Sequence, residues 1–507
     1  MDLGTVLSWT AERYPTRRAV GGDHPMTYGE WDAHTNRLAR ALATAGVGPG
    51  DRVVLALAGG EPLASLHLAA QKLGAVSVPL SFRFGADELA YCVHDAGPAL
   101  LVTDEATAAA ASGVAEVPRK EADELARLAS GESAAAVPSG VTDRDVSVML
   151  YTSGTTGRPK GVPRTHGAEH LAAVAHVIQT RLAPFDRTLG VMPMFHTMGL
   201  RTLIASVLTA GTWVPQVRFD ADRALELITA ERVDALYLVP TIFWSLLRTG
   251  RLGEARSVRK LAYAGAAMTP ALAEELVAEL RPEAFVNHFG STEIYTFSIG
   301  PDVAAKPGSA GRAGIFTRIR LVDPTPGASP DAVVAPGEQG QLAVSMRSPE
   351  AFAGYWHRPD ADAKTIRDGW YFPGDLAIAD EDGDLWVAGR VDDMINSGGE
   401  NIYPDEIEDA LVRCAAVREI VAVGLPDDRW GQAVTAFFVP EQGVSPEQAV
   451  DDLATYATVL PSLKRPKRLI AVPEIPKSAV GKILRRELTA GHFDALADSR
   501  TEKDGAR

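Results

Sequence analysis

Cysteine is scarce in this sequence, and the scarcity bears on where the protein works. Only two cysteines, Cys92 and Cys414, occur among 507 residues, and they stand far apart. A disulfide framework is therefore excluded, and a reducing compartment is expected. The first residues, "MDLGTVLSWTAERYPTRRAV", also lack the basic and then apolar order of a secretory signal. We therefore predict a cytoplasmic protein.

Long apolar runs and an excess of positive charge are absent too. No window approaches the roughly 18 consecutive apolar residues of a spanning helix, so no membrane partner is predicted. Lys and Arg number 50 against 65 Asp and Glu, which gives a net charge of −15. Nucleic-acid partners reward a basic face and are therefore disfavoured. No internal repeat is visible, and without a G-x-S-x-G elbow a serine hydrolase has no support.

The chain does contain a regular alternation of short apolar runs and helical patterns from about residue 50 to 290. Alternation of this kind favours parallel sheets covered by helices, and ligands of such sheets lie beyond the carboxyl ends of the strands. The patterns predict helices over 87–96 and 270–281. They predict strands over 52–58, 75–81, 99–104, 146–152, 187–193, 235–240, 260–265 and 284–290.

Other regions differ in composition. The Ala-rich stretch 105–140 is interpreted as peripheral helix and linker. Residues 305–390 indicate short strands punctuated by Gly and Pro, with a hairpin at Asp382-Gly383. A small α+β pattern follows, and the polar tail after Leu488 is expected to fray. The prediction is an α/β protein. Its large N-terminal domain (1–391) has helix-covered sheets and a β-rich subdomain, and a small mobile α+β domain (392–507) follows.

One segment, "YTSGTTGRPKG" (151–161), concentrates glycines, hydroxyls and a lysine directly after an apolar strand. We call it the signature loop. Glycines let backbone amides approach an anion closely, hydroxyls add donors, and Lys160 adds a mobile charge. The common P-loop requires Gly-Lys-Ser/Thr at its end, whereas Lys160 here is followed by Gly161. A phosphate cradle of another kind is predicted, with a solvated surface loop as the alternative.

The signature loop resembles that of the adenylate-forming superfamily, which includes acyl-CoA synthetases, aryl-acid ligases, peptide-synthetase adenylation domains and beetle luciferases. Further motifs follow in the order of that family and span most of the chain: "YAGAAM" (263–268), "NHFGSTE" (287–293), "WYFPGDLA" (370–377), "GRVDDMINSGGENIYPDEIE" (389–408) and "PKSAVGKILRREL" (476–488). The strongest resemblance is to benzoate-type ligases such as 4-chlorobenzoate-CoA ligase. It implies the cofactors ATP, Mg²⁺ and CoA.

The resemblance also implies roles for individual residues. Lys482 matches the lysine that contacts the forming adenylate, where its charge stabilises the transition state. Glu293 and Thr155 match magnesium ligands, and Glu293 supplies the hard oxygen that Mg²⁺ prefers. Catalytic roles are implied for Lys482, His196, Glu293 and Thr292. Nucleotide and CoA contacts are implied for Thr152, Ser153, Gly154, Thr155, Thr156, Gly157, Lys160, Phe289, Asp375, Arg390, Arg83, Trp430, Lys464 and Arg465.

Taken singly, these residues have ordinary explanations: a solvated lysine, a surface glutamate, a core histidine or a turn aspartate. One position departs from the family, because Pro373 stands where most relatives have Thr. Asp392 matches the hinge about which the family's small domain rotates between adenylation and thioester formation.

The implied acid pocket is lined by His196, Tyr237, Gly265, Ala266, His288, Gly290, Tyr295 and Thr296. His288, Tyr295 and Thr296 are more polar than their counterparts in the chlorobenzoate enzyme. We therefore expect a small aromatic acid, with a hydroxyl that these groups can bond.

The predicted function is an AMP-forming acid–thiol ligase that joins a small carboxylic acid to CoA. One alternative within the same chemistry transfers the acyl group to a separate carrier protein; another is a medium-chain fatty acyl-CoA synthetase. A third is a nucleotide-binding protein that regulates without catalysis, and a luciferase-like oxidase is possible on fold grounds alone. A homodimer is a possible assembly.

Overall fold

The computed structural model describes residues 2–114, 116–138, 140–152, 158–325, 327–397, 400–402, 404–427, 429–477 and 483–500. The chain forms two compact units. The first comprises Met1–Ile319, Val344–Tyr371 and Gly383–Leu385, and the second comprises Arg320–Ala343, Phe372–Asp382 and Trp386–Arg507.

The first unit contains a nine-stranded sheet in the order β15-β14-β13-β12-β11-β9-β10-β1-β2. Six strands, from β13 through β1, run parallel, while β15, β14 and β2 are antiparallel additions at the two edges. Their bounds are β1 Arg18–Val20, β2 Met26–Thr27, β9 Arg187–Gly190, β10 Thr212–Pro215, β11 Ala235–Leu238, β12 Lys260–Tyr263, β13 Ala284–Phe289, β14 Ser298–Gly300 and β15 Arg312–Ala313.

A second sheet of this unit has the order β6-β5-β3-β4-β7-β8, and only β7 and β8 pair antiparallel. All five residues of β4 are buried, as expected for a strand covered on both faces. The strands are β3 Arg52–Ala56, β4 Val76–Leu80, β5 Leu100–Thr103, β6 Arg119–Glu121, β7 Val146–Thr152 and β8 Lys160–Thr165.

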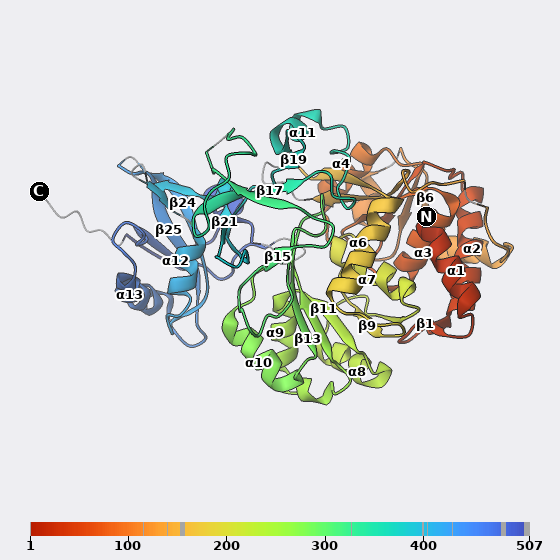
Figure 1. The fold of residues 1–507 in the computed structure, drawn as a ribbon, viewed down its shortest axis with the longest axis horizontal. Coiled ribbons are helices and arrows are strands. Elements are labelled where there is room, and N and C mark those ends of the chain that lie inside the picture. Colours follow the sequence, from red (N-terminus) through yellow and green to blue (C-terminus); the bar gives the residue numbers. More distant parts are fainter. Residues whose placement is uncertain are drawn as a thin grey trace, which may run out of the picture. The chain divides into compact units, whose positions relative to one another are not determined.

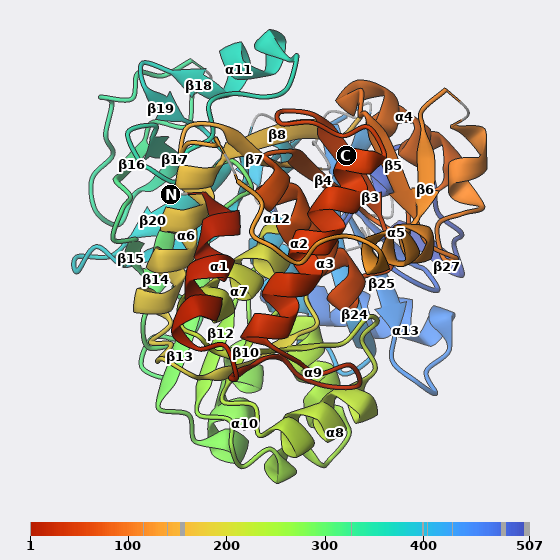
Figure 2. The ribbon, with the colours of Figure 1, turned by 90° about the vertical axis from the view of Figure 1, so that its right-hand side faces the viewer.

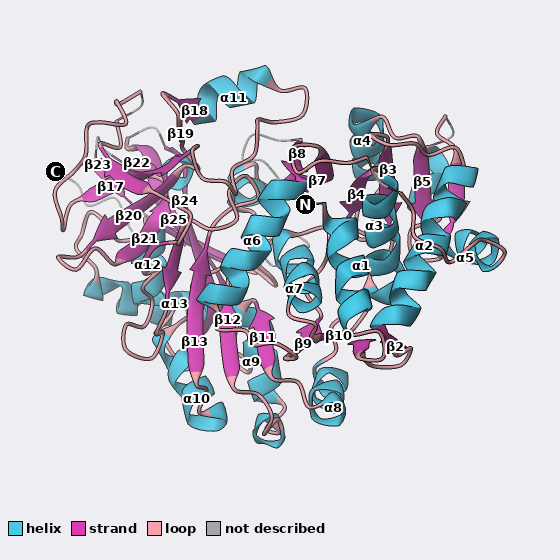
Figure 3. Ribbon diagram, turned by 45° about the vertical axis from the view of Figure 1, so that its right-hand side comes forward, coloured by secondary structure: helices cyan, strands magenta, loops and turns pink. Residues whose placement is uncertain are grey.

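Helices fill the space between these sheets and cover their outer faces (Figures 1–3). Helix α7 contacts β9, β10 and β11, and α6 packs on α7 and on β7 and β8. Helices α1, α2 and α3 join them in one apolar core, α8 to α10 pack in the core of the nine-stranded sheet, and α4 packs against β3 and β4. The bounds are α1 Leu3–Arg13, α2 Tyr28–Thr44, α3 Gly60–Leu73, α4 Ala86–Ala96, α5 Ala122–Ser130, α6 His166–Gln179, α7 Thr197–Leu208, α8 Ala221–Glu231, α9 Pro240–Arg248 and α10 Pro270–Leu280.

Local sequence explains where several helices begin and end. Thr27 and Glu30 form a capping box at the start of α2, which satisfies two otherwise unpaired amides. Thr269 caps α10, Pro270 takes its first position, and Arg281 ends it in the left-handed conformation. The unit is completed by α11 (Pro359–Thr365), β18 (Ile366–Arg367) and β19 (Trp370–Tyr371), the last pairing with the end of β17 (Gln339–Ser345).

The second unit has a sheet in the order β23-β22-β25-β26-β27, with β24 against β25. Helix α12 packs on β24, and α13 packs on β26 and β27. Its strands are β22 Ile395–Ser397, β23 Glu400–Ile402, β24 Val417–Asp427, β25 Gly431–Pro440, β26 Arg468–Ala471 and β27 Ala497–Arg500. Its helices are α12 Pro404–Leu411, α13 Pro446–Tyr456 and α14 Arg485–Thr489, and β16 (Ile319–Val322), β20 (Asp375–Ala379) and β21 (Leu385–Arg390) precede them.

The predicted α/β fold is confirmed, and every predicted strand exists within a few residues of its expected bounds. The predicted turn at Asp382-Gly383 joins β20 to β21, and Gly383 has a φ of 83°. The expectation of a fraying tail is wrong for residues 497–500, because β27 pairs antiparallel with β26. An ion pair between Arg468 and Asp498 adds to this pairing. Within the described residues, no helix combines the length and the apolar character needed to cross a membrane.

Candidate active site

The carboxyl edge of the nine-stranded sheet carries several of the predicted acid-pocket residues. Gly265 follows β12. Phe289 is the last residue of β13, and Gly290 follows it. Gly265 has a φ of 86°, which favours glycine, and a Cβ on Gly290 would lie 2.0 Å from the carbonyl oxygen of Tyr295. Phe289 is half-buried and packs edge-on against Phe297, with 5.3 Å between ring centroids. Ala266 is exposed beside Gly265, and His196 precedes α7 at the capping position.

The signature loop joins the antiparallel strands β7 and β8, which pair up to Thr152 and Lys160. Residues Ser153, Gly154, Thr155, Thr156 and Gly157, which carry predicted nucleotide contacts and one magnesium ligand, lie outside the described residues. The base of the hairpin is held from two sides. Tyr91 donates from its hydroxyl to the Pro159 carbonyl at 3.1 Å, and the Trp356 amide donates to the Gly161 carbonyl at 2.9 Å.

Lys160 and Glu293 are linked by a residue that sequence reasoning missed, Tyr355. The Lys160 ammonium lies 4.1 Å from the centroid of the Tyr355 ring, and the Tyr355 hydroxyl donates to Glu293 Oε1 at 2.6 Å. Burial lowers the pKa of Lys160, and Glu293 opposes that effect. Burial and then Glu293 raise the pKa of Tyr355, which keeps its hydroxyl a donor. Tyr355 lies 62 residues from Glu293, so no local spacing signals the contact.

A second unpredicted residue, Arg164, fixes the backbone around Glu293. Its fully buried guanidinium donates to the carbonyl oxygens of Thr292 at 3.1 Å, Glu293 at 3.2 Å and Glu350 at 2.9 Å. It also pairs with Glu169, whose second oxygen accepts from the Tyr295 hydroxyl at 3.1 Å. The backbone that carries Thr292 and Glu293 is therefore held by charge-assisted hydrogen bonds.

The remaining predicted acid-pocket side chains come together as a buried polar group. Tyr237 on β11, His288 on β13, Tyr295 and Thr296 are all at most 4% exposed. Thr296 Oγ1 lies 3.0 Å from His288 Nε2, and the Tyr237 hydroxyl lies 3.4 Å from His288 Nδ1. Arg201 on α7, another residue that was not predicted, reaches the same imidazole at 2.9 Å. Burial and then Arg201 hold the pKa of His288 well below 6.5, so the ring is neutral.

The predicted ribose pair lies within the second unit. Arg390 donates to Asp375 Oδ1 at 2.8 Å and to the carbonyl of Pro373 at 2.7 Å. Pro373, the residue that departs from the family pattern, therefore contributes its carbonyl to the placement of Arg390, and the substituted side chain does not prevent the pair.

The residues that were predicted to contact CoA contact protein groups in this structure. Lys464 pairs with Glu406, and Arg465 donates to the carbonyl oxygens of Leu460 at 2.7 Å and Thr458 at 3.1 Å. The Trp430 ring is flanked by the cations of Arg429 and Lys467, at 4.8 and 5.3 Å from its centroid. In the first unit, Arg83 is exposed beside Phe82.

Lys482 and the side chain of Asp392 lie outside the described residues. Three residues after Lys482, Arg485 is anchored to Glu408 at 2.8 Å and to Asp393 at 3.3 Å. Burial raises the pKa of Glu408 to about 7, against the effect of Arg485.

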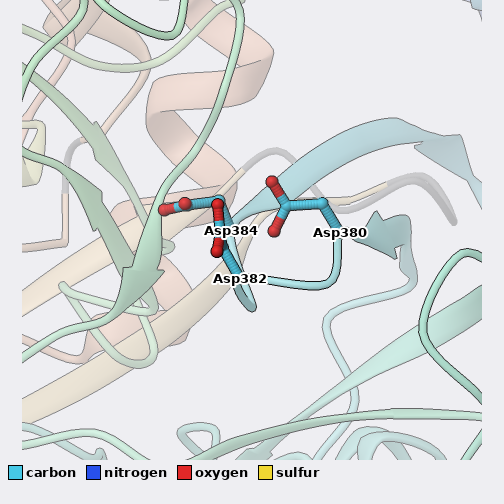
Figure 4. A group of neighbouring side chains, drawn as sticks. All are labelled: Asp380, Asp382 and Asp384. Atoms are coloured by element: carbon cyan, nitrogen blue, oxygen red, sulfur yellow. The ribbon is translucent and has the colours of Figure 1, made fainter.

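The turn between β20 and β21 is acidic. Asp380, Asp382 and Asp384 each present a carboxylate oxygen within 4.8 Å of the others (Figure 4). Asp384 pairs with Lys306 at 2.6 Å and with Arg312 at 3.3 Å. We interpret the turn as a local ion-pair network, because neighbouring carboxylates alone do not specify a cation site.

Comparison with known families decides the classification. The AMP-binding enzyme family matches residues 7–356, and the AMP-binding enzyme C-terminal domain matches residues 406–482. The chain belongs to the AMP-binding enzyme family. The predicted membership of the adenylate-forming superfamily is thereby confirmed.

Several curated relatives of this AMP-binding enzyme are CoA ligases of different acids, and another is a fatty acid–[acyl-carrier-protein] ligase, ScoC of Streptomyces coeruleorubidus. Feruloyl-CoA synthase of an Amycolatopsis species is 36% identical, over 94% of this chain and 97% of its own. Long-chain-fatty-acid–CoA ligase FadD13 of Mycobacterium tuberculosis is 33% identical, over 96% and 98%. 4-Chlorobenzoate–CoA ligase of an Arthrobacter species is 31% identical, over 95% and 94%.

Solved structures of nucleotide complexes have the same fold. ATP-bound MatB from Rhodopseudomonas palustris superposes with a TM-score of 0.86 at 28% identity, covering 97% of this chain and 99% of MatB. The complex of o-succinylbenzoate CoA synthetase (MenE) from Bacillus subtilis with ATP and magnesium has a TM-score of 0.83 at 28% identity, covering 95% and 98%.

Proposed function

We propose that this AMP-binding enzyme is an ATP-dependent ligase that joins a small aromatic acid to CoA through an acyl-adenylate. The observation that carries the proposal is the link from Lys160 of the signature loop through Tyr355 to Glu293. A cation and a buried carboxylate that contact the same tyrosine suit a nucleotide phosphate bound together with a divalent ion. The AMP-forming acid–thiol ligase class and the use of ATP, Mg²⁺ and CoA agree with the relatives and with the ATP and magnesium complexes.

The donors present fit these groups. Glu293 offers a buried carboxylate whose orientation is fixed by Tyr355, which is the chemistry that Mg²⁺ prefers. Bound there, the ion would neutralise phosphate charge. Asp375, held by Arg390, is suited to accept from two sugar hydroxyls at once. Thr292 and Lys160 are proposed to donate to phosphate oxygens, with Thr152 and the rest of the signature loop.

Lys482 is proposed to contact the forming adenylate, and His196 to border the reacting carboxylate. Phe289 is proposed to pack on the adenine. Arg83, Trp430, Lys464 and Arg465 are proposed to contact the nucleotide or CoA; for Lys464 and Arg465 this requires exchange of their present partners. The domain division at residues 391 and 392 belongs to the same proposal, as does a cytoplasmic location, which fits the two free, buried cysteines.

The acid is the finer part of the proposal, and a substrate panel tests it. Acid-dependent exchange of labelled pyrophosphate into ATP is measured with benzoate, hydroxybenzoates, chlorobenzoates, cinnamates, hexanoate and octanoate. We expect an aryl acid to give the highest kcat/KM, because His288, Tyr237 and Thr296 are polar and buried. A higher value for hexanoate or octanoate would reject the aryl assignment. Thioester formation with CoA and with a phosphopantetheinylated carrier protein separates the ligase from the carrier-loading alternative.

The hinge proposal predicts an uneven effect of Asp392→Pro. The backbone of Asp392 lies in the turn Val391–Asp393, between β21 and β22. Proline fixes φ there, so a large rotation of the following chain is hindered. We expect pyrophosphate exchange within about threefold of wild type and CoA-dependent turnover at least about tenfold lower. Equal losses in the two assays would contradict a hinge at this residue.

A further inference from the structure

Two buried side chains, Arg201 and Glu350, adjoin the predicted acid-pocket residues His288 and Thr296, and we call these four side chains the Arg201 cluster. They come from α7, from β13 and the segment after it, and from the segment after β17. Arg201 is 3% exposed and Glu350 is 0% exposed. Two opposite charges are therefore buried in the first unit at the wall formed by Tyr237 and His288.

Arg201 uses only part of its donor capacity. Its Nη1 lies 2.9 Å from His288 Nδ1 and 2.5 Å from His288 Nε2, and its guanidinium carbon lies 4.8 Å from the centroid of the Tyr295 ring. Its Nε and Nη2 have no hydrogen-bond partner among the described residues. A guanidinium presents its N–H groups as a planar fork, so this buried cation holds two unpartnered donor nitrogens, which together carry three N–H groups.

Glu350 offers buried acceptors that complement the unused donors of Arg201. Within the described part of the chain, neither of its carboxylate oxygens has a hydrogen-bond partner. Burial raises the pKa of Glu350, whereas the charge of Arg201 and then the Thr296 hydroxyl, a donor within reach of the carboxylate, oppose that rise. Arg201 and Glu350 thus interact electrostatically without a hydrogen bond between them. Buried donors and acceptors are rarely left unused, which indicates that a third group completes the cluster.

We propose that Arg201 and Glu350 recognise a hydroxyl group that the acid carries at the end remote from its reacting carboxylate. The inference rests on the proposed function, in which Tyr237, His288, Tyr295 and Thr296 line the acid pocket. A hydroxyl accepts from the Arg201 fork and donates to Glu350, so it satisfies both with one oxygen. A second carboxylate would also accept from Arg201, but it would meet the Glu350 carboxylate. Neutral His288, which itself contacts the Thr296 hydroxyl, holds Arg201 in position.

The experiment compares acids that differ at one substituent. Pyrophosphate exchange gives kcat/KM for benzoate, 3-hydroxybenzoate and 4-hydroxybenzoate, and for isophthalate and terephthalate, which place a carboxylate at the same positions. In the wild type we expect one hydroxybenzoate to exceed benzoate and both dicarboxylates by at least about tenfold, mainly through KM. In Arg201→Met and in Glu350→Gln, we expect that ratio to fall to within about threefold. Arg248→Met, at an exposed arginine of α9, serves as the control and keeps the wild-type ratio.

Four other outcomes would contradict the inference. A wild type that treats benzoate and the hydroxybenzoates alike indicates that only water completes the cluster, and it overturns this inference while the ligase function stands. A preference for a dicarboxylate would make the Arg201 cluster a carboxylate site, and it would overturn the inference equally. Retention of the hydroxyl preference in folded Arg201→Met and Glu350→Gln, checked by thermal melting, excludes these residues. No exchange with any acid rejects the proposed function itself, and this inference with it.

Discussion

We expect Lys482→Ala to lower acid-dependent pyrophosphate exchange by about 1,000-fold, which corresponds to about 4 kcal/mol of transition-state stabilisation. The proposed reason is that the lysine ammonium contacts the phosphate at which negative charge develops during adenylation. The same variant converts supplied acyl-adenylate and CoA to the thioester at nearly the wild-type rate, because the second step does not use that contact. Exchange and thioester formation are measured on one preparation, so the two steps are compared directly.

A lysine close by in the sequence provides the control. Lys477 pairs with Glu419 at 2.6 Å on the surface of the second unit, so Lys477→Ala removes a charge without a proposed catalytic role. Its exchange rate stays close to that of the wild type. If Lys482→Ala remains within about threefold of wild type, a difference of roughly 0.7 kcal/mol, the assignment of Lys482 fails.

We expect Glu293→Gln to lower kcat/KM for ATP by at least about 100-fold at low magnesium, with part of the loss recovered as the magnesium concentration rises. The substitution keeps the shape of the side chain and its acceptor for Tyr355, but it removes the negative charge that is proposed to bind the ion. Titrating exchange activity with Mg²⁺ in wild type and variant measures the shift directly.

Two further variants separate the charge of Glu293 from its surroundings. Tyr355→Phe leaves the carboxylate in place and removes only its orienting hydrogen bond, so we expect a smaller loss of about tenfold. Glu274→Gln changes an exposed glutamate of α10 and leaves the magnesium dependence unchanged. A Glu293→Gln enzyme with wild-type magnesium dependence would remove Glu293 from the proposed metal site.

The strands were predictable because their signal is local. In a buried parallel sheet, a run such as residues 53–56 is apolar throughout, and flanking charged residues such as Arg52 mark its ends. Strand β27 was missed for the opposite reason. Its residues Ala497–Arg500 are mostly polar, and they form a strand because β26 offers an unpaired edge and an ion-pair partner for Asp498. Such a partner lies 30 residues away in the sequence and carries no local pattern.

The same distinction applies to the site. Glu293, Asp375 and Lys160 stand inside recognisable motifs, whereas Tyr355, Arg164 and Arg201 act through contacts across 62 to 186 residues. Arg201 and His288 lie 87 residues apart in the sequence, and only the fold shows that their side chains meet. The motifs therefore indicated the class of reaction. The buried contacts of Arg201 and Glu350, which no motif contains, are the basis for the proposed hydroxyl on the acid.

The three carbonyl bonds of Arg164 have a consequence for anyone who diversifies this enzyme. One side chain fastens two stretches of backbone, at 292–293 and at 350, that a designer would otherwise treat as separate loops. Lysine keeps the charge but loses the planar fork, so in a saturation library position 164 should tolerate no replacement, lysine included. Libraries aimed at new acids should vary positions 237, 288 and 296 and leave Arg164 unchanged.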